Sequence, residues 1–174
     1  MRLFLMALAL LFFTIADAQQ EMPPANGPLK EALQALHAMP GDWEGDGWMF
    51  TPQRERVTFR QTERIRYKLD STVLLIEGKG TSEGKTVHDA LAVLSYEPEA
   101  RHYWMRSYLA NGRTGQYKAQ FNADGMLEWE IPVPGRKILY VIDLHEEGEW
   151  HEEGFMLLED GQRFQFFEMH LQRQ

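Results

Sequence analysis

The sequence predicts an all-β protein: a closed antiparallel up-and-down barrel of about ten strands, with one short N-terminal helix capping one end. Short stretches with strand patterning alternate with turn residues at near-regular spacing after residue 40. No segment in this region has helical periodicity, so we expect no crossover helices and no parallel sheet. The chain has no cysteine, so its core alone must stabilise it, which favours a barrel because a barrel has no free sheet edge.

The N-terminus has the features of a secretory signal peptide, residues 1–18. Residues 3–13 are wholly apolar, and Ala16 and Ala18 place small side chains at the two positions that signal peptidase reads. An uncleaved membrane anchor is the alternative, but the apolar run is short for a bilayer. We therefore expect cleavage after Ala18 and export to the bacterial periplasm or the cell exterior.

The rest of the chain divides into a flexible leader at residues 19–27 and one barrel domain at residues 28–174. Pro28 suits the first position of a helix, where its missing N–H has no partner to lose. Leu29, Leu33 and Leu36 then share one helical face, and Pro40-Gly41 ends the element. So narrow an apolar face needs support, and we expect the helix to cover one barrel mouth.

The first predicted strand, residues 43–50, organises the barrel. Trp43 is expected to plug one end, while Gly45 and Gly47 allow the strand to bend. Asn111-Gly112 is the strongest hairpin signal in the chain. The other expected strands are 54–68, 72–79, 86–96, 101–109, 114–121, 126–131, 136–144, 149–158 and 162–173.

The second strand indicates a polar interior. Its basic residues alternate with a second set that runs from Glu55 to Leu69 and contains Gln61 and Glu63. The basic set should face water and pair with Glu44 and Asp46 on the first strand. The second set should face inward, and buried polar groups without partners are costly, so we expect a ligand cavity rather than a solid core.

The overall charge limits the kinds of partner. The chain carries a formal net charge of −8, which argues against binding nucleic acid. No stretch after the signal peptide is apolar enough to insert into a membrane. The expected partner is a small molecule, and the sequence does not define an oligomeric state.

Several segments resemble known barrel families. Gly41-Asp42-Trp43-Glu44-Gly45 resembles the opening motif of calycin-type barrels, which include lipocalins and nitrobindins. The segments 87–98, 150–154 and 166–173 resemble a family of exported bacterial domains of unknown function with this calycin-like barrel. The resemblance covers roughly residues 30–173 and implies an internal cavity but no established reaction. It also implies a cationic residue of the last strand, Arg173, stacked over Trp43.

Seven residues are candidates for ligand binding. His88 has the small residues Ala90 and Ala92 on its own strand face, which leaves room for a ligand. Arg106 lies between aromatic residues and could hold a carboxylate in bidentate fashion, or could instead pair with Glu63 or Glu168. The full set is Trp48, Phe59, Glu63, His88, Trp104, Arg106 and Glu168.

Metal and haem sites are weighed against simpler interpretations. A cluster on one hairpin (His145, Glu146, Glu147, His151, Glu152 and Glu153) is interpreted as a solvated acidic turn, because alternate residues on a strand diverge. The nitrobindin resemblance suggests His170 as a haem ligand. Phe167, Met169 and Leu171 are better suited to the interior, however, which turns His170 outward. We expect no metal and no cofactor, with haem as the alternative.

No catalytic motif is apparent: the sequence has no Ser-His-Asp order, nucleophile elbow or phosphate-binding glycine loop. The favoured hypothesis is an exported protein that binds an apolar small molecule with a polar or carboxylate end. One alternative is an enzyme that uses Glu63, His88 and Glu168 as acid–base groups. Another is a structural envelope protein with a packed interior.

Overall fold

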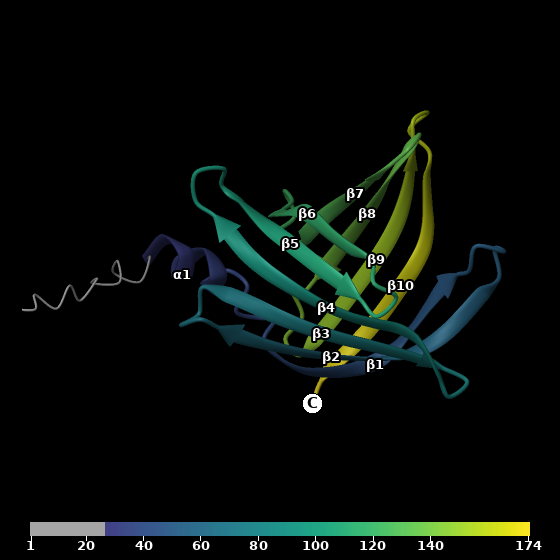
Figure 1. Cartoon of the computed structure of the whole chain (residues 1–174), viewed down its shortest axis with the longest axis horizontal. Helices are drawn as coiled ribbons and strands as arrows, with labels where there is room; N and C mark the ends of the chain where they lie inside the picture. The colour runs from purple at the N-terminus through teal and green to yellow at the C-terminus, as the bar shows by residue number, and fades with distance from the viewer. Residues whose placement is uncertain (1–26) are drawn as a thin grey trace, which may run out of the picture.

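Ten antiparallel strands close into a barrel in the computed structural model, which describes residues 27–174 (Figure 1). The predicted signal peptide and residues 19–26 of the leader lie outside the described residues. Around the barrel the strands follow the order β1-β10-β9-β8-β7-β6-β5-β4-β3-β2. The elements are α1 (Gly27–Gln34), β1 (Gly41–Phe50), β2 (Arg56–Lys68), β3 (Val73–Ser82), β4 (Lys85–Glu97), β5 (His102–Leu109), β6 (Thr114–Phe121), β7 (Leu127–Val133), β8 (Arg136–Asp143), β9 (Glu149–Leu158) and β10 (Arg163–Arg173).

This architecture confirms the predicted fold class and most of the predicted strand boundaries. Several boundaries differ by two or three residues: β1 begins at Gly41 rather than residue 43, β3 ends at Ser82 rather than residue 79, and β7 continues through Pro132 to Val133 instead of ending at Ile131. Pro132 pairs with Lys137 of β8, whereas the pairing of β7 with β6 covers only residues 127–129. The missing N–H of Pro132 therefore leaves no partner on β6 unsatisfied.

The barrel closes between its first and last strands. β1 pairs with β10 from Trp43↔Arg173 to Met49↔Phe167. The guanidinium of Arg173 lies 4.3 Å from the centre of the Trp43 ring, as predicted. Arg173 also donates to the carbonyl oxygens of Pro40 and Ala38, so one cation joins the last strand, the first strand and the segment after α1.

α1 lies at one end of the barrel and is tied to it by backbone carbonyls (Figure 1). The hydroxyl of Tyr67 donates to the carbonyl of Leu33 at 3.1 Å, and that of Tyr103 to the carbonyl of Ala32 at 2.7 Å. Leu33 and Leu36 are buried, which confirms the predicted role as a cover. The regular helix is shorter than predicted and ends at Gln34, so Leu36 reaches the core from the following turn. No helix among residues 27–174 is long and apolar enough to cross a membrane.

The glycines of β1 allow close contact with its neighbours. A side chain at position 45 would collide with the backbone of His170 and Leu171 on β10. A side chain at position 47 would occupy the space of the Phe59 ring. Glycine here lets a neighbouring strand and a core aromatic ring approach β1 directly.

β2 shows the predicted alternation. Gln61 and Glu63 are buried, while Arg60 faces outward and pairs with Glu44 and Asp46, each at 3.0 Å. The prediction fails at both ends of the segment. Leu69 lies in the turn after β2 with a φ of 49° and is 76% exposed, and Glu55 is exposed just before the strand begins.

Candidate functional site

The barrel encloses a cavity of about 400 Å³. Its lining includes Val87, Leu109, Arg113 and Ile131, which lie in or beside hairpins at the end opposite α1. Val87 and Arg113 are exposed, so the cavity reaches the surface at this end. Most of the wall is apolar and aromatic and includes Phe59, Ile76, Met105, Trp129, Phe167 and Met169.

Glu63 is the first of two carboxyl groups in this apolar wall. Its Oε1 accepts a hydrogen bond of 2.7 Å from Nε2 of Gln61, while Oε2 has no partner within the described structure. Position 78 on β3 faces this carboxyl group, and a Cβ there would lie 2.5 Å from Glu63 Oε1. Gly78 thus provides the space that Glu63 occupies. Burial raises the pKa of Glu63 to about 7.

Glu152 on β9 is the second carboxyl group. It is buried, and its Oε2 accepts a hydrogen bond of 3.2 Å from the indole N–H of Trp150. Burial, together with the negative charge of Glu63, raises the pKa of Glu152 to about 8. At neutral pH the pair therefore retains at least part of its protons, and each protonated carboxyl can donate a hydrogen bond into the cavity.

Three further polar residues of the lining are Tyr140, His88 and Ser107. Tyr140 is buried, and this burial raises the pKa of its hydroxyl, so the group stays neutral and can donate. His88 lies closer to the open end, and desolvation lowers the pKa of its imidazole despite the adjacent Asp89. Ser107 adds one hydroxyl to the wall. These groups are few and lie in an otherwise apolar wall, as is typical of small-molecule sites.

The structure places three of the seven predicted site residues, Phe59, Glu63 and His88, in the cavity wall. The other four were expected to face the ligand, and this placement was wrong. They lie on the outer face of the barrel, because each alternates with an inward-facing neighbour on its strand: Trp48, Trp104, Arg106 and Glu168.

Arg106 shows the consequence of this alternation. Its neighbours Met105 and Ser107 line the cavity, so its own side chain points away. It donates to Gln116 and to Ser95, each at 2.9 Å. Arg106 therefore forms hydrogen bonds with Gln116 and Ser95, and not the expected pair with Glu63 or Glu168.

Glu152 is the site residue that the sequence interpretation missed. It was grouped with the solvated acidic turn at residues 145–153, but β9 turns Trp150, Glu152 and Gly154 inward. Trp150 and Gly154 lie on the same strand face as Glu152, and an aromatic residue and a glycine there were the available signs that this face points into the barrel. His170, in contrast, lies outward as predicted, with its side chain 67% exposed, so it does not reach the cavity as a haem ligand.

A closed ten-stranded antiparallel barrel, capped by a helix at one end and hollow within, defines this protein as a calycin-like, or lipocalin-like, barrel. The chain belongs to the family described as "Protein of unknown function (DUF1579)", whose model matches residues 29–173. This confirms the resemblance to a barrel family of unknown function. A search of curated proteins finds no match.

Two solved structures share the fold. One is Rv2717c from M. tuberculosis, with a TM-score of 0.63 and 17% sequence identity over 82% of this chain and 97% of that chain. The other is the S-type phycobiliprotein lyase CPES from Guillardia theta, with a TM-score of 0.57 and 12% identity over 84% of this chain and 92% of that one. At these identities the likeness concerns the fold alone.

Proposed function

We propose that the protein binds a small, largely apolar molecule inside the barrel, with the polar end of that molecule beside Glu63 and Glu152. The observation that carries this proposal is the unpartnered Oε2 of Glu63 in the wall of a cavity of about 400 Å³. An unpaired buried oxygen costs roughly 1–3 kcal/mol, and a ligand group that bonds to it recovers this loss. A solved barrel of the same architecture is described as a phycobiliprotein lyase, which supports a ligand-handling interior.

The charge of the site favours one kind of polar end. Two buried carboxyl groups with raised pKa values offer protons rather than a site for an anion, and Arg106, the expected partner for a carboxylate, lies outside the cavity. Arg113 also lines the cavity, but it lies at the exposed open end. A carbonyl oxygen could accept a proton from either carboxyl group. A basic amine could take that proton and form an ion pair in the dry interior. We therefore favour a neutral acceptor or an amine over a carboxylate.

We also propose export, since the N-terminal sequence has the three parts of a signal peptide. Expression of the full chain in a bacterium and intact-mass measurement of the periplasmic fraction tests this. The expected product starts at Gln19. A protein that keeps residues 1–18 and stays in the cytoplasm contradicts the proposal.

Binding is tested by two large substitutions on adjacent residues of β4. Ala92 lines the cavity, whereas Leu91 faces outward and is 37% exposed. Ala92→Trp should fill the cavity, and Leu91→Trp should leave it open. Small molecules that co-purify with each protein are identified by mass spectrometry, and binding of the fluorescent apolar amine N-phenylnaphthylamine is measured by titration.

The proposal expects the wild-type protein and Leu91→Trp to bind the dye equally, and Ala92→Trp to lose binding at least about tenfold. Failure of the wild-type protein to bind the dye or retain any small molecule contradicts it. So does undiminished binding by a folded Ala92→Trp variant. The cavity of about 400 Å³ favours ligand binding over the alternative of a packed structural interior.

An acid–base enzyme is the second candidate, on one specific observation. Glu63 and Glu152 have pKa values of about 7 and about 8, which suits proton transfer near neutral pH. The predicted trio is not assembled, because Glu168 lies on the outer face. Conversion of the co-purified compound by the wild-type protein, lost in Glu152→Gln while binding remains, would establish this function.

A further inference from the structure

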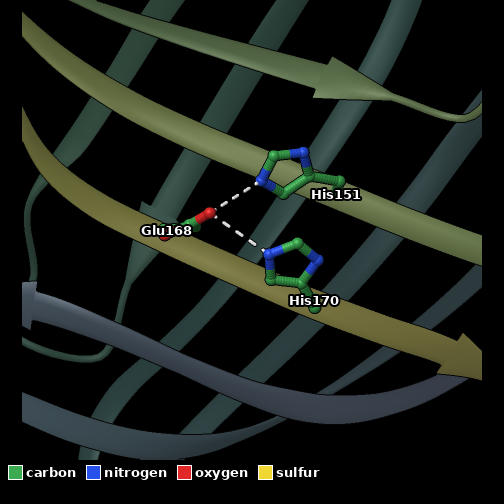
Figure 2. Close-up of side chains that lie close together, drawn as sticks. All are labelled: His151, Glu168 and His170. Carbon is green, nitrogen blue, oxygen red and sulfur yellow. Dashed lines mark hydrogen bonds and ion pairs between the residues drawn. The ribbon is translucent and has the colours of Figure 1, made fainter.

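The outer face of the barrel carries a cluster of two histidines and one glutamate (Figure 2). His151 lies on β9, and Glu168 and His170 lie on β10. Both imidazole Nε2 atoms point at the same carboxylate oxygen, Oε1 of Glu168, at 3.0 Å for His151 and 3.2 Å for His170. The potential donor atoms of the three residues all lie within 4.8 Å of one another.

The strand pairing produces this convergence. His151 and His170 are directly opposed in the β9–β10 register, and their rings stack with centroids 4.1 Å apart and an interplanar angle of 11°. A β-bulge between Gln165 and Phe167 sets the phase of β10. Phe166 and Phe167 both face the cavity, and the residues after them resume the alternation with Glu168 and His170 outward. Bulges often redirect side chains in this way beside functional sites.

A hydrogen bond from a neighbouring strand orients the Glu168 carboxylate. The indole N–H of Trp48 on β1 donates to Oε2 of Glu168 at 2.7 Å, which leaves Oε1 directed at the two histidines. Partial burial alone would raise the pKa of Glu168, but the hydrogen bonds from Trp48, His151 and His170 outweigh it and lower that pKa. The hydrogen bond from Trp48 thus orients the carboxylate toward the two histidines, as second residues orient metal-binding carboxylates.

The surroundings of the cluster are acidic. In the strand register Glu153 is opposite Glu168, Asp46 is opposite His170, and Asp143 is opposite His151. Arg60 pairs with Asp46, His145 pairs with Asp143, and Gln165 donates to Glu153. Arg60 is the one permanent cation in these pairs, and Arg56 lies over the Trp48 ring, 4.2 Å from its centroid. The carboxylates of Glu168, Glu153, Asp46 and Asp143 outnumber these two cations, so a cation bound between the histidines meets favourable charge.

We propose that His151, Glu168 and His170 bind a divalent transition-metal ion such as Zn²⁺, through the two Nε2 atoms and Oε1. Around tetrahedral zinc, with bonds of about 2.0–2.1 Å, neighbouring donor atoms lie about 3.3 Å apart. The present spacings of 3.0 and 3.2 Å are close to that value. Small rotations of the stacked rings direct both lone pairs at one point, since these torsions are broad.

Two imidazoles and one carboxylate form a donor set that suits zinc and related transition metals. Metal binding requires both Nε2 atoms to present lone pairs, with any ring proton on Nδ1. The fourth position faces solvent, because the His170 side chain is 67% exposed. Glu152 points to the other side of the sheet, so this metal site is separate from the cavity and stands independently of the proposed ligand binding.

The experiment is calorimetric titration of the purified, chelator-treated full-length protein with ZnCl₂ at neutral pH, followed by Co²⁺ titration with visible absorption. We expect one Zn²⁺ per chain and Co²⁺ bands typical of nitrogen and oxygen donors. His170→Ala and Glu168→Gln should each weaken Zn²⁺ binding about 10–100-fold. His37→Ala, which removes an exposed histidine outside the cluster and its acidic surroundings, is the matched control and should bind as the wild-type protein does.

Two results would overturn the proposal. One is the absence of Zn²⁺ binding by the folded wild-type protein, which would leave the cluster a hydrogen-bond network only. The other is equal Zn²⁺ affinity in the wild-type protein and in His170→Ala, which would make the binding nonspecific. Because the side chain of His170 is largely exposed, its removal should not unfold the barrel, and circular dichroism checks this.

Discussion

The barrel wall carries two acidic sites on its opposite faces, one built from β2 and β9 and one from β9 and β10, and the two differ in charge state. Inside, Glu63 and Glu152 lie in an apolar wall where burial raises their pKa values to about 7 and about 8. Outside, Glu168 accepts hydrogen bonds from Trp48, His151 and His170, and these hold its pKa below the ordinary value despite partial burial. His151 and Glu152 are adjacent in sequence, yet each belongs to a different site.

This difference shows how much chemistry the two-residue period of a strand controls. A carboxyl group turned inward loses water and keeps its proton, so it can serve as a donor to a neutral ligand or as a partner for an amine. A carboxyl group turned outward and given three donors is an anion, suited to holding a cation. Four substitutions test this contrast between the two faces.

The largest effect should be the pH dependence of stability. The folded-state pKa of Glu152 is raised from the ordinary value of 4.5 to about 8, so its contribution to the free energy of unfolding is full below about pH 4.5. That contribution is lost as the pH rises through about 8. Glu152→Gln, which mimics the protonated group, should stabilise the protein at pH 9 relative to the wild type by several kcal/mol, up to about 5. Urea unfolding at pH 5 and pH 9 measures the difference.

The matched control for this prediction is Glu153→Gln on the outer face of the same strand. Glu153 is partly exposed and accepts a hydrogen bond from Gln165. Its substitution should leave the pH dependence unchanged. If Glu152→Gln and the wild-type protein lose stability in parallel between pH 5 and pH 9, Glu152 does not carry a raised pKa.

A smaller effect is expected at Gly78, which provides the space for Glu63. A methyl group at this position would press on the Glu63 carboxyl group, since a Cβ lies 2.5 Å from its Oε1. Gly78→Ala should displace Glu63 and destabilise the fold by about 1–3 kcal/mol. Thermal unfolding measures this change, and a melting temperature equal to that of the wild type would show that the cavity wall is adaptable here.

The outer site should respond less to a conservative change. Trp48→Phe keeps an aromatic ring but removes the indole N–H that donates to Glu168. The loss should cost about 1 kcal/mol of stability and raise the pKa of Glu168. Chemical denaturation reports the first effect, and carboxyl NMR titration the second. An unchanged Glu168 pKa would mean that Trp48 does not orient the carboxylate.

The smallest effect on stability is expected from His170→Ala. The His170 side chain is 67% exposed, so its removal should change the free energy of unfolding by less than about 0.5 kcal/mol. The same variant should strongly weaken Zn²⁺ binding, which separates a role in binding from a role in folding. A loss of several kcal/mol in the metal-free protein would instead assign His170 to the structure of the sheet.

The sequence predicts the fold and half of the inner site well, for identifiable reasons. On β2 every second position holds a basic residue or a threonine, so the strand has one clearly basic face and one mixed face. The inward placement of Phe59, Gln61 and Glu63 on the mixed face is correct for this reason. The contact of Arg173 with Trp43 is also correct, because the resemblance to calycin-type barrels fixes both ends of the closing pair.

The rest is not decided by local pattern. On β5 both faces carry aromatic residues, Tyr103 inward and Trp104 outward. The alternation of residue types therefore does not show which face of the strand points into the barrel, and Arg106 was placed on the wrong side. β1 has the same ambiguity, with Trp43 inside and Trp48 outside. The pairing of His151 with His170 depends on the bulge at Phe166, which no local residue signal marks.

The most direct test of the account is a pH titration of the side-chain carboxyl groups by carbon NMR in uniformly labelled protein, with Glu63→Gln and Glu152→Gln to assign the signals. Two carboxyl groups should keep their protons well above pH 5 and titrate between about 7 and about 8, while Glu168 should be ionised throughout that range. If every glutamate titrates below about pH 5, near the usual value for a solvated group, the barrel interior is wet and its two carboxyl groups are not the polar end of a dry binding site.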